Sequence, residues 1–240
     1  MSIAEKLTTI AENVPKVYEA GKTAEWNRFW DNLQDYGNRK GYNYAFSWWA
    51  DEAFYPKYDI IPEQQVNSIA TTGIFAYSKI SNIKKRLEDC GVVFSTSKLN
   101  TMQSIFIGCL TEELPDLDLS YVTWGCKYCW QNCKNLRSLT LNDVQAKNVF
   151  DSAFAGCISL SEFYITGEIG RDFNVSSAPL DLPSAKRILT HLVNYAGTEN
   201  EFTYSVKFSS DVWDLLNADG ATAPDSMTWA EYVDSKCWNT

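Results

Sequence analysis

The sequence contains a single histidine, His191, among 240 residues. Zinc sites and histidine-assisted nucleophiles both use imidazole groups, so the chain has little material for either chemistry. Basic residues are also scarce, because 21 Lys and Arg stand against 30 Asp and Glu and leave a formal net charge of −9. An acidic chain is a poor partner for a nucleic-acid backbone or an anionic membrane. We therefore expect no nucleic-acid partner, no cofactor, no metal and no enzymatic activity.

Long hydrophobic runs are missing as well. No window holds the unbroken apolar run that indicates a membrane-spanning helix, and Glu5 and Lys6 interrupt the stretch that a signal peptide would keep apolar. We expect neither membrane insertion nor export by the usual route. The seven cysteines are an odd number, and without an export signal they are predicted to be free thiols that act as small buried hydrophobes.

The first segment has the pattern of an amphipathic helix. Ser2 and Glu5 form a capping-box signature, and apolar residues then recur at alternating intervals of four and three. Two interpretations stay open. The segment is either a short coiled coil that forms a homotrimer or docks the chain on a larger assembly, or one helix packed on its own fold. The pattern spans only two heptads and contains Pro15, so it is too short to exclude the packed helix. The apolar positions are Ile3, Leu7, Ile10, Val14 and Val17.

A repeat occupies the middle of the chain. An aromatic residue recurs at Phe106, Trp130 and Phe154, and a cysteine recurs in step with it at Cys109, Cys133 and Cys157. Both columns advance by one constant step, from 106 to 130 and from 130 to 154, which we call the repeat interval.

A short apolar triplet follows each of these cysteines. The third triplet follows the second by one repeat interval, but the second follows the first at a shorter distance, which predicts an insertion before the first strand. An earlier, degenerate copy of the repeat is expected near Phe75. The triplets are Leu114, Leu117, Leu119; Leu136, Leu139, Leu141; and Leu160, Phe163, Ile165.

A unit of this length with an L-x-x-L-x-L strand lies within the range of leucine-rich repeats. Along each strand, the second and third triplet residues should point inward and their neighbours outward. A single unit cannot fold alone, so the stack needs caps at both ends. At the C-terminal end, the patterns predict a helix over 183–196 ended by Gly197, a strand over 202–208, a helix stopped by Gly220, and a last helix opened by a capping box at Thr228 and Glu231.

The repeat phrases FAGCISL and WQNCKNL resemble the BspA-like leucine-rich repeat over about Phe75 to Val175. The flanking stretches, including AFYPKYDIIP and the ending from LLNADG to KCWNT, are similar to leucine-rich-repeat proteins of phage and prophage structural regions in gut Firmicutes. This resemblance implies a virion component, of the tail or virion surface, that binds other virion proteins or the host cell and has no enzymatic activity. A bacterial BspA-like adhesion protein is the alternative.

Cys126, Cys129 and Cys133 have a spacing that elsewhere indicates a zinc or iron–sulfur site. When the repeat copies are aligned, however, the positions equivalent to these three cysteines in the neighbouring copies all hold apolar or thiol side chains. We therefore predict that all three fill the core.

Two regions are candidates for binding. The first is the outward side of the repeat strands, the surface that leucine-rich solenoids commonly present to partners. The second is a dense aromatic cluster ahead of the repeats, which either contacts a ligand or neighbouring subunit or packs against the first repeat. The strand residues are Asp116, Asp118, Arg137, Ser138, Thr140, Glu162 and Tyr164, and the cluster contains Trp48, Trp49, Tyr55 and Tyr58.

Taken together, these patterns predict an α+β fold: a short leucine-rich-repeat solenoid with helical caps. We expect an N-terminal helical anchor or oligomerisation segment over 1–40, the solenoid over 41–178 with irregular first repeats to about 97, and an α/β cap over 179–240. The virion is the expected location.

Overall fold

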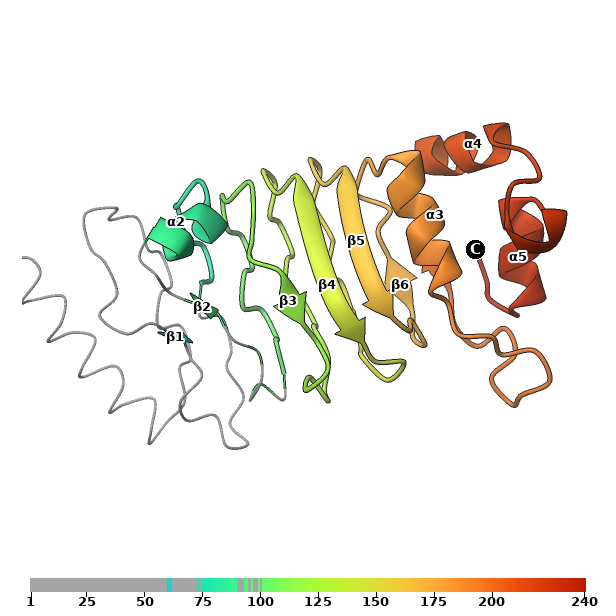
Figure 1. Ribbon diagram of the computed structural model, residues 1–240, viewed down its shortest axis with the longest axis horizontal. Coiled ribbons are helices and arrows are strands. Elements are labelled where there is room, and N and C mark those ends of the chain that lie inside the picture. The colour runs from blue at the N-terminus through green and yellow to red at the C-terminus, as the bar shows by residue number, and fades with distance from the viewer. Residues whose placement is uncertain are drawn as a thin grey trace, which may run out of the picture.

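The computed structural model describes Ile60–Ile61, Gly73, 75–89, Val93–Phe94, Thr96, Leu99 and 101–240. In this part of the chain, short strands and turns lie side by side in an elongated stack, and helices gather at its C-terminal end (Figure 1). The elements in chain order are β1 (Ile60–Ile61), α2 (Ile83–Asp89), β2 (Val93–Phe94), β3 (Leu117–Asp118), β4 (Ser138–Val144), β5 (Glu162–Gly167), β6 (Phe173–Asn174), α3 (Leu182–Thr190), β7 (Val206–Lys207), α4 (Ser210–Ala218), a 3-10 turn (Pro224–Ser226) and α5 (Trp229–Ser235).

The central sheet has the parallel order β3-β4-β5. Leu139 pairs with Phe163, and Leu141 pairs with Ile165, so β4 and β5 align at the repeat interval. These apolar residues are buried, whereas Thr140 and Tyr164 between them face outward. The predicted alternation along the two longer strands is confirmed, because successive side chains of a strand point to opposite faces.

The predicted register of the first strand is wrong. Matching the triplets position by position places Leu119 opposite Leu141, but Leu117 pairs there, so β3 and β4 also keep the repeat interval. Glu113 bridges Ser138, which leaves residues 114–116 facing the shorter stretch 139–140. The irregularity therefore lies at the entry to β3, where Pro115 lacks the N–H needed for a regular ladder.

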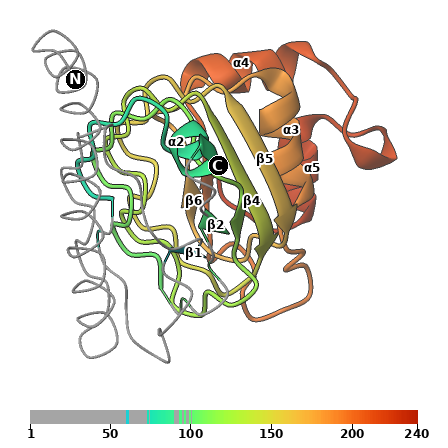
Figure 2. The ribbon, with the colours of Figure 1, turned by 60° about the vertical axis from the view of Figure 1, so that its left-hand side comes forward.

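A second ladder of backbone hydrogen bonds joins the turn segments on the other side of the core. The N–H of Phe106 donates to Cys129 O at 2.9 Å, and the N–H of Trp130 donates to Ala153 O at 3.1 Å. Each turn needs left-handed backbone at the same columns, as Tyr128 and Ser152 show with φ of 56° and 51°. The turns of the repeat thus stack as regularly as its strands (Figure 2).

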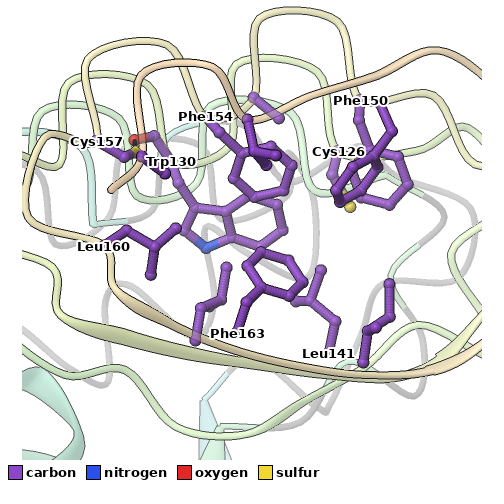
Figure 3. Close-up of a cluster of buried hydrophobic side chains, with 14 of the residues drawn as sticks. Cys126, Trp130, Leu141, Phe150, Phe154, Cys157, Leu160 and Phe163 are labelled. Carbon is purple, nitrogen blue, oxygen red and sulfur yellow. Dashed lines mark hydrogen bonds between the residues drawn. The ribbon is translucent and has the colours of Figure 1, made fainter. Parts of the chain in front are cut away.

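The core lies between the turns and the strands. Phe106, Trp130 and Phe154 are fully buried, as predicted. Figure 3 shows Phe154 reaching from its turn toward Phe163, and the two rings meet edge to face at 5.4 Å between centroids. Phe75 stacks on Phe106 with centroids 5.5 Å apart, so the aromatic column continues one copy further toward the N-terminus, at a longer interval.

The repeat cysteines bond across neighbouring copies. The Sγ–H of Cys133 donates to Phe106 O at 2.9 Å, and that of Cys157 donates to Trp130 O at 3.0 Å. A thiol fits this column because it is small and apolar yet offers one weak donor. The cysteine column therefore satisfies a carbonyl of the preceding copy while it fills the core.

Helix α3 takes the place beside β5 where another strand would pair. Ser184 Oγ accepts from Phe163 N–H at 2.8 Å, and Arg187 Nη1 donates to Phe163 O at 3.0 Å. The helix ends at Thr190, so the prediction of a helix to Ala196 is wrong. The chain leaves the helix because Ile169 N–H donates to His191 O at 2.8 Å, which draws the following residues into a strand-like bridge.

The C-terminal elements close the stack. β6 and β7 pair in parallel, but the predicted strand over 202–208 shortens to Val206–Lys207. Helix α4 ends at Ala218, ahead of Gly220 as predicted, and the capping box of Thr228 and Glu231 at the start of α5 is confirmed. Among the described residues, no helix is long and apolar enough to cross a membrane.

Candidate functional site

The outward side of the parallel sheet forms a continuous polar surface, which we call the strand face. Ser138 lies opposite Glu162, and Thr140 lies opposite Tyr164. Paired strands lie about 4.8 Å apart, so these predicted residues are direct neighbours. The strand face consists of Asp118, Ser138, Thr140, Asn142, Glu162 and Tyr164.

Asn142 is a member that the sequence analysis missed. It pairs with Asp118, because the observed register places Leu117 rather than Leu119 opposite Leu141. The signal was present in the sequence: a strict shift of one repeat interval from Asp118 leads to Asn142. The unequal triplet spacing concealed it.

The middle of the strand face keeps its hydrogen-bonding capacity. Within the described residues, the side chains of Ser138, Thr140, Asn142 and Glu162 have no hydrogen-bond or ion-pair partner. Asp118 differs, since its Oδ1 accepts from Ser120 N–H at 2.8 Å. Hydroxyl, amide and carboxylate groups on adjacent strands are therefore available to a partner.

Tyr164 bounds this surface on the side of α3. The guanidinium carbon of Arg187 lies 4.4 Å from the centre of the Tyr164 ring, and the ring remains 47% exposed. A cation over an aromatic face is attracted by the ring quadrupole and restrains the ring. The phenol is thus held in place while one side stays open to a partner.

Two other predicted residues use their charges within the chain. Asp116 Oδ1 lies 3.9 Å from Lys84 Nζ, and Arg137 Nη2 lies 3.6 Å from Glu112 Oε2. Arg137 precedes β4, and Asp116 precedes β3, so both border the strand face. Exposed pairs of this kind contribute little to stability.

The remaining predicted sites lie outside the described residues. These are the aromatic cluster with Trp48, Trp49, Tyr55 and Tyr58, and the apolar positions Ile3, Leu7, Ile10, Val14 and Val17.

The thiols and the imidazole have structural surroundings. Cys126, Cys129 and Cys133 are fully buried, which confirms that they fill the core, and burial raises the pKa of each thiol. His191 Nδ1 lies 2.8 Å from Gly167 O. In the described part of the chain, no three His, Cys, Asp or Glu side chains are grouped closely enough to hold a metal ion.

An exposed aromatic pair also escaped the sequence analysis. Trp124 is 76% exposed and Tyr121 57% exposed, both in the turn that follows β3. Large aromatic side chains are more often found at binding surfaces than fully in water. The only sequence signal is their place in a turn just ahead of Gly125.

The arrangement of these groups supports recognition. The strand face offers donors and acceptors at fixed positions, while the nucleophilic thiols of the repeat are enclosed in the core. Comparisons with protein-family models, curated proteins and solved structures find no match for the chain.

Proposed function

We propose that this chain is a non-enzymatic structural protein of a phage virion, at the tail or virion surface, and that it binds another virion protein or the host cell surface. In this proposal, the repeats form a short leucine-rich-repeat solenoid, and the strand face is the binding surface. The observation that carries the binding role is the row of unpaired polar side chains at Ser138, Thr140, Asn142 and Glu162. The virion assignment depends on the resemblance of the repeat and flanking sequences.

A rigid support favours binding by this surface. Backbone hydrogen bonds join the copies on both sides of the core, through the β3-β4-β5 sheet and through the turn ladder. Polar groups that are already positioned lose little conformational entropy when a partner binds. The strand face can therefore recognise a partner without a folding step.

The surroundings of the reactive groups support a role without catalysis. Nucleophilic catalysis by cysteine needs an accessible thiolate. Burial raises the pKa of Cys126 and Cys157, which keeps both thiols protonated at neutral pH.

The virion assignment is tested on particles induced from a strain that carries the gene. Mass spectrometry across a density gradient should find the chain in the virion fractions, at a constant ratio to the tail proteins. Uninduced cells provide the control. If the chain is present on uninduced cells and missing from particles, the bacterial adhesion alternative replaces the proposal.

The strand face is tested by competition for adsorption. Purified chain should slow attachment of the phage to its host, and Glu162→Lys should lose this effect because it reverses a charge on the face. Glu199→Lys is the matched control, since Glu199 is exposed and lies in the C-terminal region. Equal inhibition by the two variants would show that the partner binds elsewhere.

The two interpretations of the N-terminal helix, a trimeric coiled coil or a helix packed on its own fold, are tested separately. If the helix forms the coiled coil, light scattering should give three times the chain mass for the full protein and a single chain mass for a protein that starts at Gly41. An unchanged oligomeric state after truncation would leave the N-terminal helix as a packed element of its own fold.

A further inference from the structure

The turn ladder stops after the third turn of the repeat. Cys126 N–H donates to Val149 O at 2.7 Å, and Tyr128 N–H donates to Asp151 O at 3.0 Å. The equivalent donors one repeat interval later are the N–H groups of Phe150 and Ser152, and neither has a partner within the described residues. The next segment, β6, bonds forward instead, as Phe173 N–H donates to Ser205 O at 2.9 Å.

A polar pocket of about 390 Å³ opens at this interruption. It is lined by residues 127–128 and 150–152 from two turns, and by Asp172, Asn174, Ser205 and Lys207 in and beside β6 and β7. In the preceding copies, the N–H groups of these columns point toward the following segment. By the same geometry, the N–H groups of Phe150 and Ser152 should face the pocket, where two ligand oxygens could accept from them. Buried phenyl rings support this wall, since Phe150 packs edge-on against Phe173 with centroids 5.0 Å apart.

The formal charges around the pocket balance. Lys127 and Lys207 stand against Asp151 and Asp172, and Lys127 Nζ lies 3.5 Å from Asp151 Oδ2. Within the described residues, Lys207 has no ion-pair partner. A set of charges that sums to zero gives no net attraction for an anion or a cation. The pocket therefore favours a neutral, polar ligand.

Hydrogen bonds inside the wall fix which polar atoms remain available. Asp172 Oδ1 accepts from Ser205 N–H at 2.8 Å and from Ser205 Oγ–H at 3.0 Å, which leaves Oδ2 as an acceptor. Asn174 Oδ1 accepts from Ser176 N–H at 3.0 Å, which leaves the amide Nδ2 as a donor. The groups that remain available in the pocket include two backbone donors, an amide donor, an ammonium group and a carboxylate oxygen of Asp172.

We propose that this pocket binds a neutral N-acetylated sugar. The acetamido carbonyl accepts from one of the N–H groups of Phe150 and Ser152, and a sugar oxygen accepts from the other, because in the preceding copies these two donors reach separate carbonyls. The sugar hydroxyls donate to Asp172 and accept from Lys207 and Asn174. Hydroxyl groups both donate and accept, so they match this mixed set better than a purely accepting ion does. The volume lies within the range of small-molecule sites. This site is distinct from the strand face, and its proposal does not depend on virion binding.

The test is a titration of the ¹⁵N-labelled full chain with N,N′-diacetylchitobiose, followed by two-dimensional NMR. The amide signals of Phe150 and Ser152 should shift in a saturable way. Maltose, which lacks the acetamido group, should bind roughly tenfold more weakly, as expected for the loss of about 1.4 kcal/mol. Asn174→Ala and Lys207→Ala should each weaken binding roughly three- to tenfold, because each removes one hydrogen bond to the ligand. Lys147→Ala, a change of an exposed lysine outside the pocket, is the matched control.

Several results would overturn the proposal. One is the absence of saturable shifts at roughly 20 mM ligand, which would fill a millimolar site. Another is tighter binding of inorganic phosphate, or of an acetylated dipeptide amide, which would identify an anion or a peptide as the preferred ligand. Unchanged affinity in both pocket variants would place the sugar elsewhere. Signals far from the pocket must stay unmoved in each variant, which shows that the fold is intact.

Discussion

The indole ring of Trp130 stacks on the phenyl ring of Phe154, with centroids 5.2 Å apart and planes only 3° from parallel. The indole thereby occupies the position that a phenyl ring holds in the neighbouring copies. Its Nε1–H is buried and has no acceptor within the described residues. The larger ring adds apolar contact to the core, but it leaves one donor unsatisfied, which costs about 1–3 kcal/mol.

Replacing Trp130 should separate these two effects. Trp130→Ala leaves a cavity between stacked copies and should lower the free energy of unfolding by about 3–5 kcal/mol. Trp130→Phe keeps an aromatic ring in the column and removes the unsatisfied donor, so its cost should be well below that of the alanine variant. Urea unfolding followed by circular dichroism measures both values. Trp124→Ala is the control, because an exposed tryptophan should change stability by less than about 0.5 kcal/mol. Equal losses from the two Trp130 variants would contradict this account.

Gly125 should tolerate no side chain, since the neighbouring copy lies against its Cα. Its φ is 95°, and a Cβ atom there would overlap the backbone of Val149. Gly197 has a φ of 77° but nothing close to the position of a Cβ atom. The left-handed backbone lowers the free energy of unfolding of both alanine variants by about 1 kcal/mol. Any further loss of stability in Gly125→Ala therefore measures the overlap of its Cβ atom with the neighbouring copy. Thermal unfolding of the two variants gives this difference directly, and similar midpoints would show that the copies can separate without cost.

The turn side of the repeat was more predictable from the sequence than the strand side. The spacing of Phe106, Trp130 and Phe154 is strict in the sequence, and their burial follows from it. The strand side contains an extra residue near Pro115, so counting leucines gave the wrong partner for Leu141. Leucines two residues apart on one strand share a face, so the apolar pattern fits either register. The strict interval of the aromatic and cysteine columns is the sequence signal that favours Leu117.

The C-terminal region was less predictable for a different reason. The apolar spacing of Leu189, Leu192 and Val193 fits a helix, yet Leu192 bridges Ile169 instead. Long-range backbone bonds override such local patterns. The pocket beside Phe150 and Ser152 also depends on long-range backbone hydrogen bonds, because it opens where the turn ladder stops. The repeat in the sequence does not extend to β6 and β7, so it could not predict this pocket.

The described cysteines should react with thiol reagents at very different rates. Cys109, Cys126, Cys129, Cys133 and Cys157 are buried, whereas Cys237 is half-buried. Iodoacetamide labelling of the native chain should therefore modify Cys237 first, and urea should release the other five. Desolvation and the nearby Glu201 and Asp234 carboxylates raise the pKa of Cys237, so its labelling rate should still be rising with pH above 9. Peptide mapping by mass spectrometry resolves each site. Rapid native labelling of Cys133 would show that the core opens locally.

Asp219 should make the stability of the C-terminal helices depend on pH. Its Oδ2 lies 2.6 Å from Lys186 Nζ on α3 and accepts from Trp229 Nε1–H on α5 at 3.2 Å. The hydrogen bond from Lys186, with further bonds from Thr222 and Trp229, lowers the pKa of Asp219 to about 2. An unfolded aspartate titrates near pH 3.9, so the contribution of Asp219 is complete above that pH and is lost as the pH falls toward about 2.

Substituting Asp219 by asparagine tests this contribution. Asp219→Asn should be less stable than the natural chain at pH 7, and the two should converge between about pH 4 and pH 2. Removing a negative charge from the C-terminal end of α4 would by itself be stabilising, so a net loss isolates the contacts with Lys186 and Trp229. Asp214→Asn on the same helix is the control, because Asp214 is exposed and has no ion pair within the described residues. Thermal unfolding from pH 2 to pH 7 measures all three proteins, and parallel curves for the natural chain and Asp219→Asn would refute the role of this carboxylate.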